Sequence, residues 1–271
     1  MSRSEKLFGP LRWLVILVAA SIAGCGSGGG GSDAPMRSAG LPTAPGAGGG
    51  VGGLGQGPAP IALNTAGNFV IVAETAITNT PLSAVTGNVG LSPASGAAIE
   101  LTCAEVTGTI NTVSTAGPLP CRKVNAGVLT QAIDDGHTAW HDGSVRPPDY
   151  TNVLAGNIGG VNFPPATYKW NTGVQISSNI TLTGGPNDVW IFLIEHDLSV
   201  SPGVQVILDG ALARNVYWLT LIDGVDLGAN SQFAGTILAE TSIFMRTGAS
   251  ITGRLLAAQS INLDTNTVTA P

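Results

Sequence analysis

The sequence predicts a mainly β protein: a parallel β-helix of triangular cross-section with one α-helix packed along one of its faces. Three observations predict this fold. Short strands recur in a degenerate repeat after residue 147, one strand of most repeats is apolar throughout, and the chain holds one convincing amphipathic helix. Three short strands and three turns in a unit of about 20 residues are typical of a β-helix.

The first 25 residues have the features of a bacterial lipoprotein signal. Positive residues precede an apolar run at 13–20, which is too short to count as a membrane span. The run ends in Ile22-Ala23-Gly24-Cys25, which resembles a lipobox, in which the cysteine is acylated. We therefore expect residues 1–24 to be a signal peptide and Cys25 to carry lipid. The alternative is an ordinary secretory signal with an incidental cysteine.

These features predict an exported protein, anchored to the cell membrane or the outer membrane through Cys25, with release from the cell as an alternative. Gly26 stands where an aspartate often retains lipoproteins at the inner membrane, which favours the outer surface. Residues 25–60 are rich in Gly, Ser, Ala and Pro and have little to bury, so we expect a flexible tether. Residues 61–271 then form one domain.

The cysteines and charges narrow the class of protein. There are three cysteines. If Cys25 is lipidated, Cys103 and Cys121 remain to form a disulfide after export, with two free buried thiols as the alternative. The net charge is −6 with few lysines, which argues against nucleic acid as a partner.

The first part of the domain predicts strands at 69–73 and 84–90, followed by an irregular cap between the two cysteines. A helix is predicted over residues 123–141, with Asp134 and Asp135 on the side away from its apolar stripe. The apolar residues of that stripe are Val124, Val128, Leu129, Ala132, Ile133 and Trp140.

After residue 147, corresponding strands define three faces of the expected stack. The strands of the first face start at Leu198, Val225, Ile243 and Ile261. Those of the second face are centred on Gln205, Gln232, Ser250 and Thr267. The third face contains 189–193, 216–220, 236–239 and 254–257, and is apolar on both sides of its strands. A doubly buried strand needs a cover, so we expect the helix to pack on the third face.

The second face is predicted to carry uncharged, short side chains outward. Its outward residues are Gln205, Gln232, Ser250 and Thr267, then Ile207, Ala234, Thr252 and Thr269, with Thr181 and Thr183 from an earlier coil. The first face presents Gln175, Ser199, Asp226, Phe244 and Asn262, which are rougher and include a charge. A stiff array of methyl and hydroxyl groups can order surface water as ice does. The alternative is that Thr and Ser merely favour exposed strands.

Many short motifs follow one another in order over the domain. They include Leu63-Asn64-Thr65-Ala66-Gly67-Asn68-Phe69, Thr86-Gly87-Asn88-Val89-Gly90-Leu91-Ser92-Pro93, Asn187-Asp188-Val189-Trp190-Ile191-Phe192 and Leu263-Asp264-Thr265-Asn266-Thr267-Val268-Thr269. In these motifs and their order the domain resembles the large microbial ice-binding protein family, whose fold is a right-handed discontinuous β-helix with an α-helix alongside. The resemblance implies a disulfide-bearing cap before the helix, which fits Cys103 and Cys121.

Some members of that family carry a four-residue pattern on the binding face. It consists of Thr, then either Ala or Gly, then any residue, and then either Thr or Asn. Thr65-Ala66-Gly67-Asn68 fits this pattern and Thr247-Gly248-Ala249-Ser250 nearly does, so the resemblance adds Thr65, Asn68 and Thr247 as candidates. Thr86-Gly87-Asn88-Val89 departs at its last position, and Gln205, Gln232 and Ile207 depart from a clean threonine array. The choice of face therefore stays open.

Two groups of titratable residues are candidates for a catalytic or metal site. His137 and His141 have zinc-ligand spacing but lack a general base between them, and Glu195-His196-Asp197 lacks a nucleophile. We expect no catalytic residues, metal or cofactor. The predicted function is ice binding by a monomer, which inhibits ice growth or recrystallisation or attaches the cell to ice. The alternatives are a cell-surface adhesin or structural module and, less favoured, a carbohydrate-active enzyme.

Overall fold

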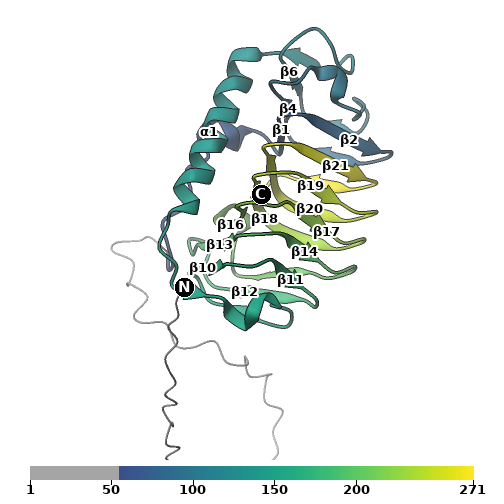
Figure 1. The fold of residues 1–271 in the computed structure, drawn as a ribbon. Helices are drawn as coiled ribbons and strands as arrows, with labels where there is room; N and C mark the ends of the chain where they lie inside the picture. The colour runs from purple at the N-terminus through teal and green to yellow at the C-terminus, as the bar shows by residue number, and fades with distance from the viewer. Residues whose placement is uncertain (1–54) are drawn as a thin grey trace, which may run out of the picture. The chain divides into compact units, whose positions relative to one another are not determined.

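The computed structural model describes residues 55–271, which form a stack of parallel β-coils with one helix along its side (Figure 1). The predicted signal peptide, Cys25 and most of the tether lie outside the described residues. Residues 55–60, which the composition assigned to the tether, contact the stack. Val189 N donates to Gln56 O at 3.0 Å, and Gln56 N donates to the Asp188 carboxylate at 2.6 Å.

The first face is a six-stranded parallel sheet. Its order is β11 (Val174–Ile176), β14 (Leu198–Val200), β17 (Val225–Leu227), β19 (Ile243–Met245), β21 (Ser260–Asp264) and β2 (Ala76–Thr80). The strands that the repeat aligned are direct partners here, since Leu198 pairs with Val225, Val225 with Ile243, and Ile243 with Ile261. The predicted register of this face is therefore confirmed.

The second face runs from β9 to β5. Its strands are β9 (Asn162–Phe163), β12 (Ile180–Thr183), β15 (Val206–Asp209), the first halves of β18 (Gln232–Ala239) and β20 (Ser250–Ala257), then β22 (Thr267–Thr269), β3 (Ala84–Thr86) and β5 (Val106–Thr107). Gln205 bridges to Gln232 and so continues the pairing from β15 to β18.

The third face of the described stack consists of ten strands or half-strands. They are β8 (Tyr150–Thr151), β10 (Thr167–Trp170), β13 (Trp190–Ile194), β16 (Val216–Thr220), the second halves of β18 and β20, then β1 (Ile71–Ala73), β4 (Val89–Leu91), β6 (Ile110–Thr112) and β7 (Arg122–Val124). Every residue of β13 and β16 is buried, as predicted. Trp190 and Phe192 belong to the core inside the stack, whereas Ile191 and Leu193 pack in the layer under the helix.

The stack is discontinuous in sequence. The first strands of the domain lie on the last coil, because β1 pairs with β20, β2 with β21 and β3 with β22. In Figure 1 the chain begins its coils at one end, returns along α1 to the other end, and then builds the remaining coils back toward the first. The resemblance implied a discontinuous β-helix, which the structure confirms; the pairing of the first strands with the last coil was not predicted.

Helix α1 covers the third face but begins later than predicted. It spans Ala126–Ser144, and its buried residues are Leu129, Ala132, Ala139 and Gly143. Val124 lies in β7 because pairing with β6 overrides its helical spacing, and Val124 and Val128 are exposed at 48% and 39%. Asp135 does not face away from the body, because its carboxylate accepts a hydrogen bond from Thr65 N at 2.8 Å.

Short 3-10 helices close several turns. They are η1 (Asn64–Asn68), η2 (Gly96–Ala98), η3 (Val153–Gly156) and η4 (Ala213–Asn215). The predicted strand at 84–90 is two strands, β3 and β4, because Gly87 turns the chain with φ +138°. Residue 69 precedes β1 rather than starting it.

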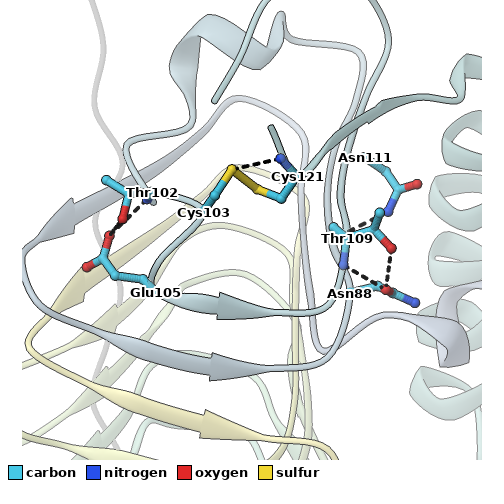
Figure 2. The surroundings of a disulfide bond; sticks show 7 residues. All are labelled: Asn88, Thr102, Cys103, Glu105, Thr109, Asn111 and Cys121. Atoms are coloured by element: carbon cyan, nitrogen blue, oxygen red, sulfur yellow. Dashed lines mark hydrogen bonds between the residues drawn. A yellow bond between two sulfur atoms is a disulfide. The ribbon is translucent and has the colours of Figure 1, made fainter. Parts of the chain in front are cut away.

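The cap is pinned by the predicted disulfide between Cys103 and Cys121 (Figure 2). The segment between them is more regular than predicted, since it contains β5 and β6. Glu105 follows Cys103 and accepts hydrogen bonds from the Thr102 and Ser83 backbone N–H groups, each at 2.8 Å. These contacts fix the entry of the chain into β5 and so place the last coil of the second face.

Candidate functional site

The second face carries two parallel columns of outward side chains. We call the first the threonine column; in stack order it contains Thr181, Ile207, Ala234, Thr252, Thr269, Thr86 and Thr107. The second is the mixed column, which contains Gln205, Gln232, Ser250, Thr267 and Ala84. Most of the residues predicted for this face therefore lie together. Ala234 is the exception in exposure: it is only 5% exposed and belongs to the core, so it adds no surface to the column, contrary to the prediction.

Strand alternation places the partners of these columns inside the stack. Phe233, Ile251, Val268 and Val85 lie between the outward positions of successive strands, and all four are buried. Successive side chains of a strand point to opposite faces of the sheet, so burying these apolar residues forces the intervening Thr, Ser and Gln residues outward. The core thus fixes the direction of the outward columns.

Four threonines occupy adjacent rungs of the threonine column. Thr252 pairs with Thr269, Thr269 with Thr86, and Thr86 with Thr107. Neighbouring strands lie about 4.8 Å apart and alternate residues along a strand about 6.7 Å apart, which makes the two columns a regular grid. Thr252, Thr86 and Thr107 are exposed, and Thr269 is half-buried.

These threonine side chains are rigid and available to solvent. Branching at Cβ restricts the χ1 rotation of threonine, so each methyl and hydroxyl keeps its place in the grid. Among the hydrogen bonds of residues 55–271, none uses the hydroxyl of Thr252, Thr269, Thr86 or Thr107, so these groups remain free to bind water.

A glycine follows the threonine column at four coils and turns the chain into the third face. These residues are Gly235, Gly253, Gly87 and Gly108. A Cβ on Gly253 would lie 1.8 Å from Gly235 O, and one on Gly108 would lie 2.3 Å from Gly87 O. Only glycine allows coils to stack this closely at the corner, and the close stacking keeps the threonines in register.

The first face differs from the second face in its charge and in the size of its side chains. Its outward column contains Gln175, Ser199, Asp226, Phe244, Asn262 and Thr78. Arg246 pairs with Asp226, with Nε 2.9 Å from Oδ1, and its guanidinium lies over the Phe244 ring at 5.4 Å. Thr78 donates to the Asn262 side chain at 2.7 Å. The polar groups here are largely satisfied by one another, so the second face is the better candidate.

Four of the predicted candidates lie outside the grid or at its margin. Thr65 and Asn68 are on η1, which packs beside α1. Thr247 lies in the turn after β19, where its hydroxyl donates to Asp264. Thr183 ends β12 and donates to the Asp209 carboxylate at 3.2 Å, so a charge adjoins it.

Sequence reasoning missed three residues of the grid. Thr86, Thr107 and Ala84 belong to β3 and β5, which stack on β22 through long-range pairing. A signal was present: Thr86-Gly87 and Thr107-Gly108 repeat the Thr252-Gly253 dipeptide, which ends the same face two and three coils away in the stack. The recurring Thr-Gly corner would have placed them.

One histidine of each titratable group pairs with a carboxylate. His137 Nε2 lies 2.7 Å from Glu74 Oε1, and His196 Nδ1 lies 2.9 Å from Asp223 Oδ2, both in exposed positions. Within residues 55–271 no group of three or more His, Cys, Asp or Glu residues is arranged to hold a metal ion. In the same residues, no helix has the length and apolar character to cross a membrane.

Comparison with known proteins gives one consistent family. The Ice-binding-like family model matches residues 71–269. An ice-binding protein of Flavobacterium frigoris is 45% identical over 211 residues, covering 77% of this chain and 76% of the relative. One from a Colwellia species is 41% identical over 220 residues, covering 80% and 87%.

Solved structures agree with the sequence comparisons. A glycosylated ice-binding protein from an Arctic yeast superposes with a TM-score of 0.72 at 28% identity, covering 78% of this chain and 94% of that one. An ice-binding protein from an Antarctic biological consortium gives a TM-score of 0.66 at 31% identity, covering 79% and 93%. These relatives confirm the predicted fold class, and they give no support to the adhesin alternative.

Proposed function

The chain belongs to the Ice-binding-like family, and from this premise we propose that it binds ice through the second face of its stack. The observation that carries the assignment of the face is the run of four threonines on adjacent rungs, Thr252, Thr269, Thr86 and Thr107. The mixed column extends this run into a two-dimensional array with Ser250, Thr267 and Ala84.

Adsorption follows from the stiffness and neutrality of this array. The threonine methyl groups bind the surface water only weakly. The threonine hydroxyls, which repeat at the spacing of the strands, can take positions in an ordered water layer. Each contact is weak, but a rigid surface loses little conformational entropy on binding, so many contacts add. The columns carry no ionisable side chain, so no charge disturbs the ordered layer. A crystal plane covered by such molecules stops growing between them.

The end of the second face near β5 fits this role better than the end near β12. Toward β12 the threonine column contains the bulky Ile207, and Thr183 and the charged Asp209 adjoin its margin. Toward β5 the same column contains threonine on every rung. We therefore place the centre of the ice-binding surface on β20, β22, β3 and β5.

We further propose that the protein is exported, anchored through Cys25 and active as a monomer without catalysis. The lipobox resemblance supports the anchor, and the ice grid needs no second subunit because one chain supplies all of its rungs. Mass spectrometry of the membrane fraction should detect acylated Cys25, and Cys25→Ser should release the protein into the soluble fraction. Unmodified Cys25 in membrane-bound protein would overturn the anchor.

Two assays test the ice function directly. Fluorescently labelled protein should be incorporated into a slowly growing ice hemisphere, and unlabelled protein should inhibit recrystallisation at micromolar concentration. A control protein of similar size and charge should be excluded from the growing ice. If the labelled chain is excluded as well, the proposed function is wrong.

A further inference from the structure

A groove lies between α1 and the third face, away from the ice-binding columns. It is shallow, with a cavity volume of about 30 Å³, and it opens to solvent. Val72, Leu238 and Leu256 line it, and their exposed fractions of 3%, 2% and 6% place them at its floor. Gly136 leaves the helix side open, since a Cβ there would meet nothing within 4 Å. The groove therefore offers a concave apolar surface within reach of water.

The rim of the groove is negatively charged. Glu74 and Glu240 line it together with His137, and the lining contains neither lysine nor arginine. Glu240 is exposed, and the Glu74 side chain is 20% exposed, with Oε1 2.7 Å from His137 Nε2. An apolar body with a positive charge would complement this surface, whereas an anion would meet two carboxylates.

Trp140 gives the groove an aromatic wall. Its Nε1 donates to Thr220 O at 3.1 Å, which fixes the orientation of the indole beside the groove. Trp170, Trp190 and Trp218 are fully buried, so Trp140 is the one partly exposed tryptophan of residues 55–271. Tryptophan attracts a cation over its ring face more strongly than any other side chain.

We propose that this groove binds a small organic cation, a quaternary or alkylammonium group with an apolar body. The apolar floor takes the alkyl groups, Trp140 faces the positive charge, and Glu74 and Glu240 provide the counter-charge. This inference goes beyond ice binding, because the groove and the threonine column lie on different faces of the stack.

Choline is the probe, and Trp140 fluorescence is the readout. Titration of the full chain should change the fluorescence saturably at constant ionic strength, and Trp140→Phe should abolish that change. Glu240→Gln and Glu74→Gln should each weaken binding about threefold or more, because each removes one counter-charge without changing shape. Asp134→Asn, an exposed change on the same helix outside the groove, is the matched control.

A neutral isostere separates charge from shape. The alcohol 3,3-dimethyl-1-butanol has the form of choline without its charge and should bind far more weakly. His137→Ala should tighten choline binding, because it frees Glu74 from its internal partner. No saturable response at about 0.1 M choline, equal binding of the alcohol, or equal weakening by Asp134→Asn would each overturn the proposal. Ice recrystallisation assays on the same variants should be unchanged, so this proposal can fail without the ice function failing.

Discussion

Thr269 and Thr86 are direct partners in the pairing of β22 with β3, although they come from opposite ends of the folded domain. Thr252 continues the column on one side of this junction and Thr107 on the other. The threonine column therefore exists only when the first coils dock on the last one. Folding of the discontinuous stack and assembly of the ice-binding surface are the same event.

Replacing Thr86 with Tyr should reduce ice recrystallisation inhibition severalfold. The side chain is exposed at the centre of the column, so a ring there would hold neighbouring rungs away from the ice. Thr252→Tyr and Thr269→Tyr should act in the same direction. Because aromatic residues are accepted on exposed strands, the free energy of unfolding should change by less than about 0.5 kcal/mol. Thermal melting and recrystallisation assays measure the two effects.

The first face supplies the control for these variants. Ser199→Tyr places the same ring on the outward column of that face, beside Asp226. Its ice activity should match that of the unmodified chain. If Ser199→Tyr is the damaging change and Thr86→Tyr is harmless, ice binds to the first face instead.

Asn266→Ala should lower both stability and ice activity. Asn266 is 1% exposed at the turn before β22; its Nδ2 donates to Arg246 O at 2.8 Å and to Ala249 O at 3.0 Å. Removing the side chain takes one of two donors from each of these carbonyls and leaves the Asp264 N–H, 2.6 Å from Asn266 Oδ1, without its acceptor, which costs about 1–3 kcal/mol. The strand that presents Thr267 and Thr269 also loses its anchor. The denaturant midpoint of this variant and its inhibition of ice recrystallisation should both be lower than those of the unmodified chain. An unchanged denaturant midpoint would refute the anchoring role.

Local patterns in the sequence predicted the coils after β13 well. The alternation of buried Phe233, Ile251 and Val268 with polar neighbours determines the outward positions, and strand periodicity alone reveals it. The pairing of β22 with β3 could not be derived in this way, since it joins distant segments and leaves no local pattern. The family resemblance implied a discontinuous β-helix but not which strands meet at its junction.

The misplaced helix start and the missed Thr107 have related causes. Val124 continues the helical spacing, yet pairing with β6 makes it a strand residue. Thr107 lies in β5, which is two residues long and too short to show a period. Tertiary pairing decides the conformation of such short segments, so their structure follows from the stack and not from their own sequence.

Glu105→Gln should destabilise the protein at neutral pH, and the difference should shrink in acid. Burial alone would raise the pKa of Glu105, but hydrogen bonds from Thr102, Asn79 and Ser83 outweigh it and hold the pKa below the ordinary value of a glutamate. A carboxylate with a lowered pKa contributes stability above its unfolded pKa and loses that contribution as pH falls through the folded pKa. Glutamine presents an amide to groups that need an acceptor, so the variant should lose about 1–3 kcal/mol at neutral pH.

Thermal melts from about pH 7 to about pH 3 measure this difference. The gap between Glu105→Gln and the unmodified chain should be full at neutral pH, begin to shrink below the pKa of the unfolded carboxyl, and disappear as the pH falls through the lower pKa of the folded state. Glu240→Gln, at an exposed position, should show no such gap. A gap at position 105 that stays constant throughout the range would show that the carboxylate charge does not stabilise the cap.

Gly136→Ala should stabilise the protein, whereas Gly143→Ala should destabilise it, although both lie in α1. A Cβ at Gly136 would meet nothing within 4 Å, so alanine gains about 1 kcal/mol of helix propensity without a clash. A Cβ at Gly143 would lie 2.5 Å from Leu219 Cδ2 and 2.8 Å from Ile61 Cδ1, and overpacking of this kind costs about 1–3 kcal/mol. Denaturant midpoints at constant m-value should therefore move in opposite directions. If both midpoints rise, α1 lies farther from the third face than these contacts require.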